Sequence, residues 1–243
     1  MEWSDNGIVL SARPHGEGHA VVELLTAGHG RHAGLVYGGA GRRMRPALEI
    51  GNLVAAHWRG RLAEHLGTLT IELEKAEAAR FLDDPLKLAG LSAACAVASS
   101  SLPEREPHPA LYEAMRVLIA HMEDDDLWPA LYVKWELGLL QELGFGLDLD
   151  RCAVTGASGP NAPLTHVSPK SGRAVSAEAA EPYLDKLLPL PGFLRRAEEP
   201  QPQDIADGLS LSGHFLERRV FHLANKQAPE PRRRLEDAIA RTL

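Results

Sequence analysis

The first 80 residues alternate between short apolar runs and turns rich in glycine. The runs cover residues 7–10, 20–26, 32–37, 53–58 and 66–72. In the fourth run, Val54, Ala56 and Trp58 alternate with Ala55 and His57, as in a strand that buries one face. Five short strands separated by turns predict a small β-barrel rather than an α/β unit.

The pattern becomes helical near residue 81. Asp84 followed by Pro85 is typical of a helix start, since the acid can cap and the proline fits the first turn. Helical spacing then covers residues 86–101, 110–122, 127–143, 177–188 and 203–223. The segment 127–143 is apolar nearly all round, so we expect it at the centre of a helical core. The last long helix is expected to bury Leu209, Phe215, Leu216, Val220 and Phe221.

Two segments lack this regularity. Residues 148–176 are rich in Gly, Pro, Ser and Asn and show no helical period, and residues 229–243 form a charged tail with room for one more short helix. The pattern therefore predicts an α+β protein with a barrel domain at 1–80 and a helical domain at 81–243, interrupted by an irregular excursion at 148–176.

Composition narrows the class of protein. Of the 243 residues 44% are hydrophobic, and no apolar run reaches the roughly 18 residues that a membrane helix needs. The early acids Glu2 and Asp5 do not fit a secretory signal or transit peptide. Two cysteines are too few for a disulfide framework, so we expect a reduced, cytoplasmic protein. Without a phosphate-binding loop, a nucleophile elbow or a partnered cysteine, the sequence predicts no enzyme.

The net charge of −7 is unevenly distributed. Residues 1–80 hold nine basic and nine acidic residues, whereas residues 81–194 hold eight basic and sixteen acidic ones. Five arginines and a single acid, Glu49, stand between Arg42 and Arg61. A local patch of this sign can bind phosphates on an acidic protein, and we expect modest, salt-sensitive affinity.

The candidate binding residues are therefore basic and aromatic. Arginine suits phosphates because its planar fork donates two hydrogen bonds at once. Tyr37 could stack on a base, and Trp58 could too, although core packing is favoured for Trp58. A solvated loop that binds nothing is the alternative for the basic residues. The candidates are Arg42, Arg43, Arg45, Arg59 and Arg61.

The histidines raise the question of a metal. His15 and His19 are four residues apart, and His29 and His32 are three apart. Zinc needs three or four converging ligands, and this spacing does not converge side chains on strands and turns as it would on a helix. We therefore expect no metal and no cofactor.

Five segments in order along nearly the whole chain carry a family likeness. They are residues 7–10, 30–43, 134–146 (from Lys134-Trp-Glu-Leu to Gly146), 147–156 and 213–219. In combination they resemble the RecO family of bacterial recombination mediators and repair proteins, above all its alphaproteobacterial form. The resemblance implies an N-terminal OB-fold followed by a helical domain, in agreement with the pattern above.

The resemblance also implies a function. It implies binding of single- and double-stranded DNA, annealing of complementary strands, and loading of RecA with the partner RecR, at the nucleoid. Basic residues of the OB-fold would meet the DNA, and the five arginines occupy that kind of position. The C-terminal tail of the single-stranded-DNA-binding protein (SSB) would dock on the helical domain near Lys134 and Trp135, where a lysine lacks the bidentate fork of arginine.

The sequence departs from the family at one place. Many members of the family that this chain resembles carry two CxxC pairs as a zinc knuckle. Here the first pair reads Cys152-Ala-Val-Thr155, and the second is lost near Val175 and Ser176. One thiolate cannot hold a structural zinc. We expect the excursion to fold without metal, through packing and turn hydrogen bonds; stoichiometric zinc in elemental analysis would refute this.

Two other functions stay open from the residues alone. The acidic middle of the chain also fits a helical protein-interaction scaffold whose small barrel binds a protein partner. A histidine-dependent metallohydrolase is the less favoured alternative. Salt dependence of binding separates the first from a DNA binder, and metal content together with a His29→Ala variant tests the second.

Overall fold

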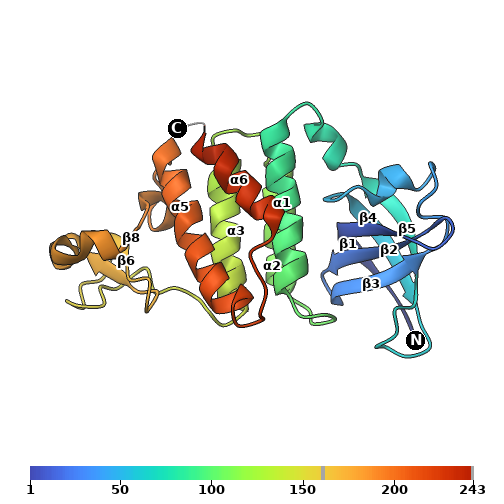
Figure 1. The fold of residues 1–243 in the computed structure, drawn as a ribbon, viewed down its shortest axis with the longest axis horizontal. Helices are drawn as coiled ribbons and strands as arrows, with labels where there is room; N and C mark the ends of the chain where they lie inside the picture. Colours follow the sequence, from blue (N-terminus) through green and yellow to red (C-terminus); the bar gives the residue numbers. More distant parts are fainter. Residues whose placement is uncertain (160–161, 242–243) are drawn as a thin grey trace. The chain divides into compact units, whose positions relative to one another are not determined.

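The computed structural model describes residues 1–159 and 162–241 of the chain (Figure 1). Its five N-terminal strands close into a barrel in the order β1-β2-β3-β5-β4. The strands are β1 (Glu2–His15), β2 (His19–Thr26), β3 (Gly30–Val36), β4 (Leu53–Arg59) and β5 (Thr68–Lys75). The α+β class and the N-terminal OB-fold are confirmed.

Strand β1 is much longer than the apolar run at 7–10 because it serves two neighbours. Its first half pairs with β4, from Glu2 opposite Arg59, and its second half pairs with β2, ending with His15 opposite His19. The register shifts between Val9 and Ser11, where a bulge lets the strand turn from one neighbour to the other. The first half of β1 is mostly polar, so the search for apolar runs did not predict it as a strand.

The barrel core contains one fully buried tryptophan. Trp58 is 1% exposed, as favoured from the sequence, and its indole Nε1 donates to the carbonyl of Leu66 at 2.9 Å. Between β3 and β5, a Cβ added to Gly34 would lie 2.6 Å from Cγ of Leu69. Only glycine therefore fits at this contact.

Helix α1 (Pro85–Ser101) packs against β1. It begins as predicted: one carboxylate oxygen of Asp84 accepts from the backbone N–H groups of Leu86 and Lys87 at 3.0 and 3.1 Å. A short 3₁₀ turn, η2 (Ala78–Phe81), precedes it, and α2 (Pro109–Ala120) follows. Cys95 on α1 is fully buried, and burial raises the pKa of its thiol to about 12.

The contacts divide the chain into two compact units. The barrel unit contains Met1–Ala120 and Pro229–Leu235, and the helical unit contains His121–Ala228 and Glu236–Leu243. The division falls inside α6 (Glu230–Ala240), the short helix expected in the charged tail. Packing thus groups α1 and α2 with the barrel, whereas the pattern at residue 80 grouped them with the later helices.

In the helical unit, α3 (Trp128–Glu142) packs on α5 (Pro202–Phe215), which continues as a π-helical turn over Leu216–Phe221. The buried side expected of the segment 203–223 is confirmed, because the five residues expected there are all 8% exposed or less. No helix in the two described stretches of chain is long and apolar enough to cross a membrane.

Two expectations for the helical unit are wrong in part. The excursion contains β6 (Leu164–Val167) and β7 (Ala174–Ser176), which form a small sheet in the order β7-β6-β8 with β8 (Leu188–Pro189). The helix expected at 177–188 is only α4 (Ala177–Ala180) followed by a 3₁₀ segment, Glu181–Lys186. Pro182 has no N–H to continue an α-helix, and Tyr183 leaves helical geometry at φ −134°.

Candidate nucleic-acid interface

The connection between β3 and β4 carries three of the candidate arginines on an anchored loop. At its start, the N–H of Ala40 donates to the carbonyl of Gly18 at 3.2 Å, which ties the loop to the β1–β2 turn. Gly39 lies so close to β2 that an added Cβ would come within 2.8 Å of the Ala20 side chain. The first half of the loop is therefore held against the barrel wall.

The second half is anchored by a 3₁₀ turn, η1 (Arg45–Leu48), whose Ala47 and Leu48 are buried. The side-chain amide of Asn52 donates to the carbonyl of Pro46 at 2.8 Å and accepts from the N–H of Ala78 at 3.1 Å. Because both ends are fixed, the loop presents its exposed side chains at defined positions rather than on a free coil.

Arg42, Arg43 and Arg45 are exposed on this loop. Within residues 1–159 and 162–241, none of their side chains forms an ion pair or hydrogen bond. By contrast, Arg31, Arg80 and Arg116 each pair with a glutamate. The guanidinium donors of the loop are thus available to an anionic ligand.

Tyr37, which immediately follows β3, is 64% exposed. Its ring meets His19 edge to face, with 5.0 Å between the ring centroids, and Nδ1 of His19 accepts from the N–H of Gly38 at 3.3 Å. One edge of the tyrosine is supported while much of the ring faces solvent. The structure therefore leaves Tyr37 free to stack beside the arginine loop.

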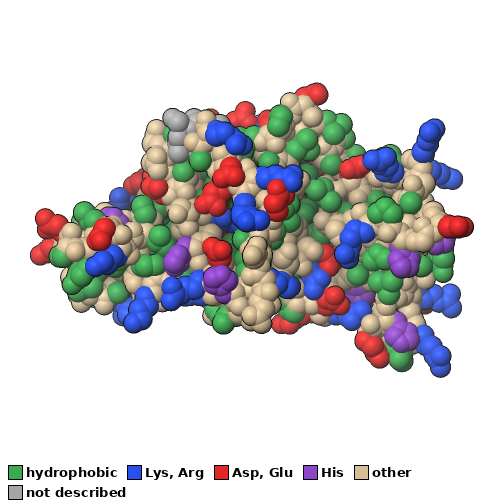
Figure 2. Space-filling model, viewed as in Figure 1, with side chains coloured by type: hydrophobic (Ala, Val, Ile, Leu, Met, Phe, Trp, Pro, Cys, Tyr) green, Lys and Arg blue, Asp and Glu red, His purple; other side chains and the backbone are tan. Residues whose placement is uncertain are grey.

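Arg59 and Arg61 are also exposed and unpaired among the described residues, but they lie elsewhere. Arg59 ends β4 and Arg61 follows it, whereas the arginine loop leads into the start of that strand at Leu53. At about 3.3 Å per residue, β4 separates its two ends by about 20 Å. The five arginines form two groups, and Figure 2 likewise shows basic side chains projecting from the barrel at separate points.

The second candidate site lies on α3. Lys134 is exposed, and its ammonium nitrogen lies 5.8 Å from the ring centroid of Phe193. It lines a hollow of about 320 Å³ whose other walls include Leu137, Leu149 and Leu194. Trp135, in contrast, is 2% exposed and belongs to the core, so its expected contact with a partner is corrected: consecutive helix positions point about 100° apart.

The next residue on α3 is buried as well. Glu136 is 0% exposed, and the hydroxyl of Ser212 on α5 donates to its carboxylate. Within the three consecutive residues Lys134, Trp135 and Glu136, only the lysine can therefore meet a ligand.

Cys152, where the sequence predicts a zinc-free excursion, lies at the centre of a hydrogen-bonded cluster. Sγ of Cys152 accepts from the backbone N–H of Ser176 at 3.2 Å and of Thr155 at 3.4 Å, and the hydroxyl of Ser176 lies 3.4 Å away. Burial raises the pKa of this thiol, but the hydrogen bonds from Ser176 and Thr155 outweigh burial and lower it to about 6. Thr155 and Ser176 thus both contact the sulfur of Cys152 directly.

The histidines do not converge on a common point. His29 Nδ1 lies 2.9 Å from a carboxylate oxygen of Asp5, and its ring stacks on Trp3 with 4.2 Å between centroids. His32 is 4% exposed and meets Trp3 and Trp58 edge to face, each at 5.0 Å. Among the described residues, no group of three or more His, Cys, Asp or Glu side chains is placed to hold a metal.

This aromatic cluster was not foreseen from the sequence. Its members come from the start of β1, the β2–β3 turn, β3 and β4, so no local spacing links them. Burial is the largest cause that lowers the pKa of His32, and together with the nearby Arg105 and His29 it brings the value to about 4. One signal was available in the sequence. His32 occupies a buried position of the strand in phase with Gly30, Gly34 and Val36, where a histidine is unusual.

Comparisons with known proteins identify the family to which the two parts of the chain are similar. Residues 1–76 match the family model described as Recombination protein O N terminal, and residues 82–228 match Recombination protein O C terminal. The DNA repair protein RecO of Rhodospirillum centenum is 55% identical over 237 residues, which cover 98% of this chain and 94% of that protein. Those of Methylobacterium nodulans and Caulobacter vibrioides are 52% and 49% identical, over 96% and 99% of this chain and 95% and 98% of theirs.

Proposed function

Because the chain belongs to the RecO family and so has a role in DNA repair, we propose that it acts as a non-enzymatic mediator that binds single- and double-stranded DNA. One observation carries the proposal: Arg42, Arg43 and Arg45 are exposed without partners among the described residues, on a loop fixed at both ends. An anchored set of free guanidinium groups suits a phosphate backbone better than a solvated coil would, since little order is lost on binding.

In this proposal the arginines hold phosphates without reading sequence. Tyr37 beside the loop stacks on a base, and Arg59 with Arg61 contacts the backbone of the same or a second strand at the other end of β4. Holding two strands while screening their charge promotes annealing of complementary strands. No covalent step is required of the protein.

The helical unit supplies the protein contact. We propose that Lys134 pairs with a carboxylate of the SSB tail while apolar residues of the tail enter the hollow beside Leu137, Leu149 and Leu194. Trp135 supports α3 from the core instead of touching the tail. With RecR as a further partner, this contact would bring RecA to DNA coated by SSB in the cytoplasm, at the nucleoid.

The test is fluorescence anisotropy of a labelled single-stranded oligonucleotide over a salt series. The wild-type chain should bind at low salt and lose affinity steeply as salt rises, by about 10³-fold if several phosphates are contacted. Arg42→Glu/Arg43→Glu should abolish most of this binding. The matched control is Arg151→Glu/Arg218→Glu, which changes the charge equally at two exposed arginines of the helical unit that have no partner among the described residues.

Two outcomes contradict the proposal. One is absence of binding by the wild-type chain at low salt, which leaves a protein-interaction scaffold as the better account. The other is an equal loss of affinity in both double variants, which would show that the effect comes from net charge and not from the anchored loop.

A further inference from the structure

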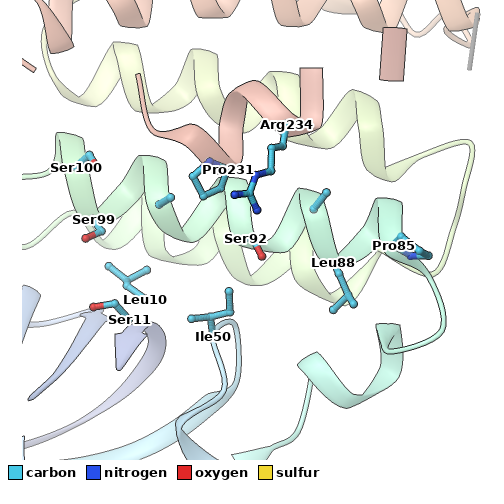
Figure 3. Close-up of a pocket in the computed structure, with 12 residues that line it drawn as sticks. Leu10, Ser11, Ile50, Pro85, Leu88, Ser92, Ser99, Ser100, Pro231 and Arg234 are labelled. Carbon is cyan, nitrogen blue, oxygen red and sulfur yellow. The ribbon is translucent and has the colours of Figure 1, made fainter. Parts of the chain in front are cut away.

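The barrel unit contains an apolar groove along the exposed face of α1. Half-buried residues of α1, among them Leu88, Ser92 and Ser99, form its floor, and the hollow measures about 570 Å³. Figure 3 shows Leu10 and Ile50 on one side of this face and the start of α6, with Pro231 and Arg234, on the other. All lining residues belong to the barrel unit.

The dimensions of the groove fit a helix. Its lining residues run from Pro85 to Ser100 on α1, which is about 22 Å at the rise of an α-helix. The half-buried row on α1 that faces the groove includes small side chains: Ala89, Ser92, Ala96 and Ser99 follow at spacings of three and four residues. Small residues let a second helix approach to the usual 8–10 Å between axes. A helix of about 15 residues would fill this length.

The charge at one end of the groove is positive. A second hollow of about 600 Å³ shares Ile50, Leu88 and Ser92 with the first and is rimmed by Arg42 and Arg45. Glu49 is its only acidic lining residue, so the rim carries a net charge of +1. Arg234 at the opposite side of the first hollow already pairs with Glu230. Acidic residues at one end of a docked helix would therefore find two free guanidinium groups.

The lining also argues against a nucleobase as the occupant. None of the described residues that line either hollow is aromatic, whereas sequence-independent binding of bases relies on aromatic stacking. At the edge of the second hollow, Leu82 is 69% exposed and offers a further apolar contact. Aliphatic walls with an arginine rim suit an amphipathic peptide better than DNA.

We propose that this groove binds an amphipathic α-helix of a partner protein, with the apolar face of the helix on α1 and acidic residues against Arg42 and Arg45. The mode is a helix laid into a hydrophobic groove, with apolar anchors at i, i+3, i+4 and i+7. This site is distinct from the hollow beside Lys134, which lies in the helical unit.

The proposal has a regulatory consequence that rests on the proposed DNA-binding function. Arg42 and Arg45 cannot serve phosphates and a docked acidic helix at the same time. Helix binding and DNA binding should therefore compete, and each should weaken the other by the same factor.

The test uses the full chain and three synthetic labelled peptides of about 15 residues in anisotropy titrations up to about 0.5 mM. One peptide is an amphipathic helix with Leu on one face and Glu on the other, the second replaces every Glu with Lys, and the third scrambles the first. We expect the wild-type chain to bind the acidic helix and to bind the other two at least about tenfold more weakly.

Variants of the chain locate the site. Ala96→Glu places a charge on the groove floor at a half-buried helical position, with a residue that favours helices, and it should weaken binding of the acidic helix at least about tenfold. Arg42→Glu/Arg45→Glu should weaken it to a similar extent and improve binding of the Lys peptide. Arg59→Glu/Arg61→Glu, with the same charge change at the other end of β4, should leave peptide binding unchanged. Circular dichroism of each variant checks that it is folded.

The outcomes separate this inference from the proposed function. Failure of the wild-type chain to bind the acidic helix, equal binding of all three peptides, or indifference to Ala96→Glu overturns the helix groove. A wild-type dimer that Ala96→Glu turns into a monomer assigns the groove to a second copy of the chain and also overturns it. If the peptide binds as expected but single-stranded DNA fails to displace it, the groove stands and the DNA role of Arg42 and Arg45 fails.

Discussion

Arginines at the two ends of strand β3 have opposite environments. At its start, Arg31 is 15% exposed in its side chain, donates from Nε to the carbonyl of Leu102 at 2.8 Å, and pairs with Glu23 and Glu104. Just beyond its end, Arg42 and Arg43 are exposed with no partner among the described residues. The difference teaches that a basic residue is available to a ligand only where the fold has left its donors unfilled.

The largest effect on stability is expected from removing the interactions of Arg31 at the start of β3. Among the described residues, Arg31→Ala leaves the Glu23 carboxylate, 10% exposed, with only the hydroxyl of Ser99 as a donor, and it should cost about 3 kcal/mol of unfolding free energy. Arg43→Ala should change it by less than about 0.5 kcal/mol. Urea denaturation of both variants measures this. Equal stabilities would mean that Arg31 is as dispensable to the fold as the loop arginines.

The barrel also contains a buried histidine, His32, whose ring nitrogens have no hydrogen-bond partner within the described stretches of chain. This histidine is expected to make the fold sensitive to acid. His32 is neutral in the folded state because its pKa falls to about 4, whereas the unfolded chain titrates near 6.5. The unfolded state therefore binds the extra proton, and stability is lost as pH falls from 6.5 to 4, by up to about 3 kcal/mol.

His32→Phe should flatten this dependence while keeping the ring contacts with Trp3 and Trp58. Thermal unfolding of the wild-type chain and the variant at pH 7.5 and near pH 4.5 makes the comparison. An unchanged slope in the variant would assign the acid sensitivity to other groups.

In the helical unit, Cys152 is another group whose hydrogen bonds are filled by the fold, as those of Arg31 are in the barrel unit. Cys152→Ala leaves the N–H groups of Thr155 and Ser176 without their acceptor and should cost about 2 kcal/mol. The folded pKa of about 6 lies below the ordinary 9, so the thiolate contributes stability that is fully present above pH 9 and lost as pH falls through 6.

Thiolate absorbance during a pH titration of a Cys95→Ala background reads this pKa directly, since Cys152 is then the only cysteine. Cys152→Ser, which keeps an acceptor without the charge, is the control for the stability measurement. A titration midpoint near 9 would show that the hydrogen bonds do not hold a thiolate.

The smallest effect concerns the open end of β3. Tyr37→Ala should weaken binding of single-stranded DNA by about 1 kcal/mol, the loss of one stacked base, without changing the salt slope. Tyr37→Phe should behave as wild type because stacking needs only the ring. A change in salt slope with Tyr37→Ala would indicate that the loop had moved its arginines, contrary to the anchoring by Asn52.

Local chemistry in the sequence was enough for most elements. Glycine-separated runs located the barrel strands, Asp84 with Pro85 located the start of α1, and the apolar period of 203–223 identified its buried side correctly. These features depend on residues a few positions apart, so local patterns in the sequence are enough to predict them. The likeness to RecO, read from five segments, was confirmed by the family comparisons.

Only the tertiary structure decided which of the candidate residues are free to act. It separated the arginines into two groups because the extended strand β4 lies between the arginine loop and Arg59, and it buried Trp135 because α3 turns that face onto its neighbours. It also brought Ser176 to Cys152 across 24 residues and placed Ile50 beside α1 to form the groove. Such contacts depend on how distant segments pack, which no local pattern in the chain specifies.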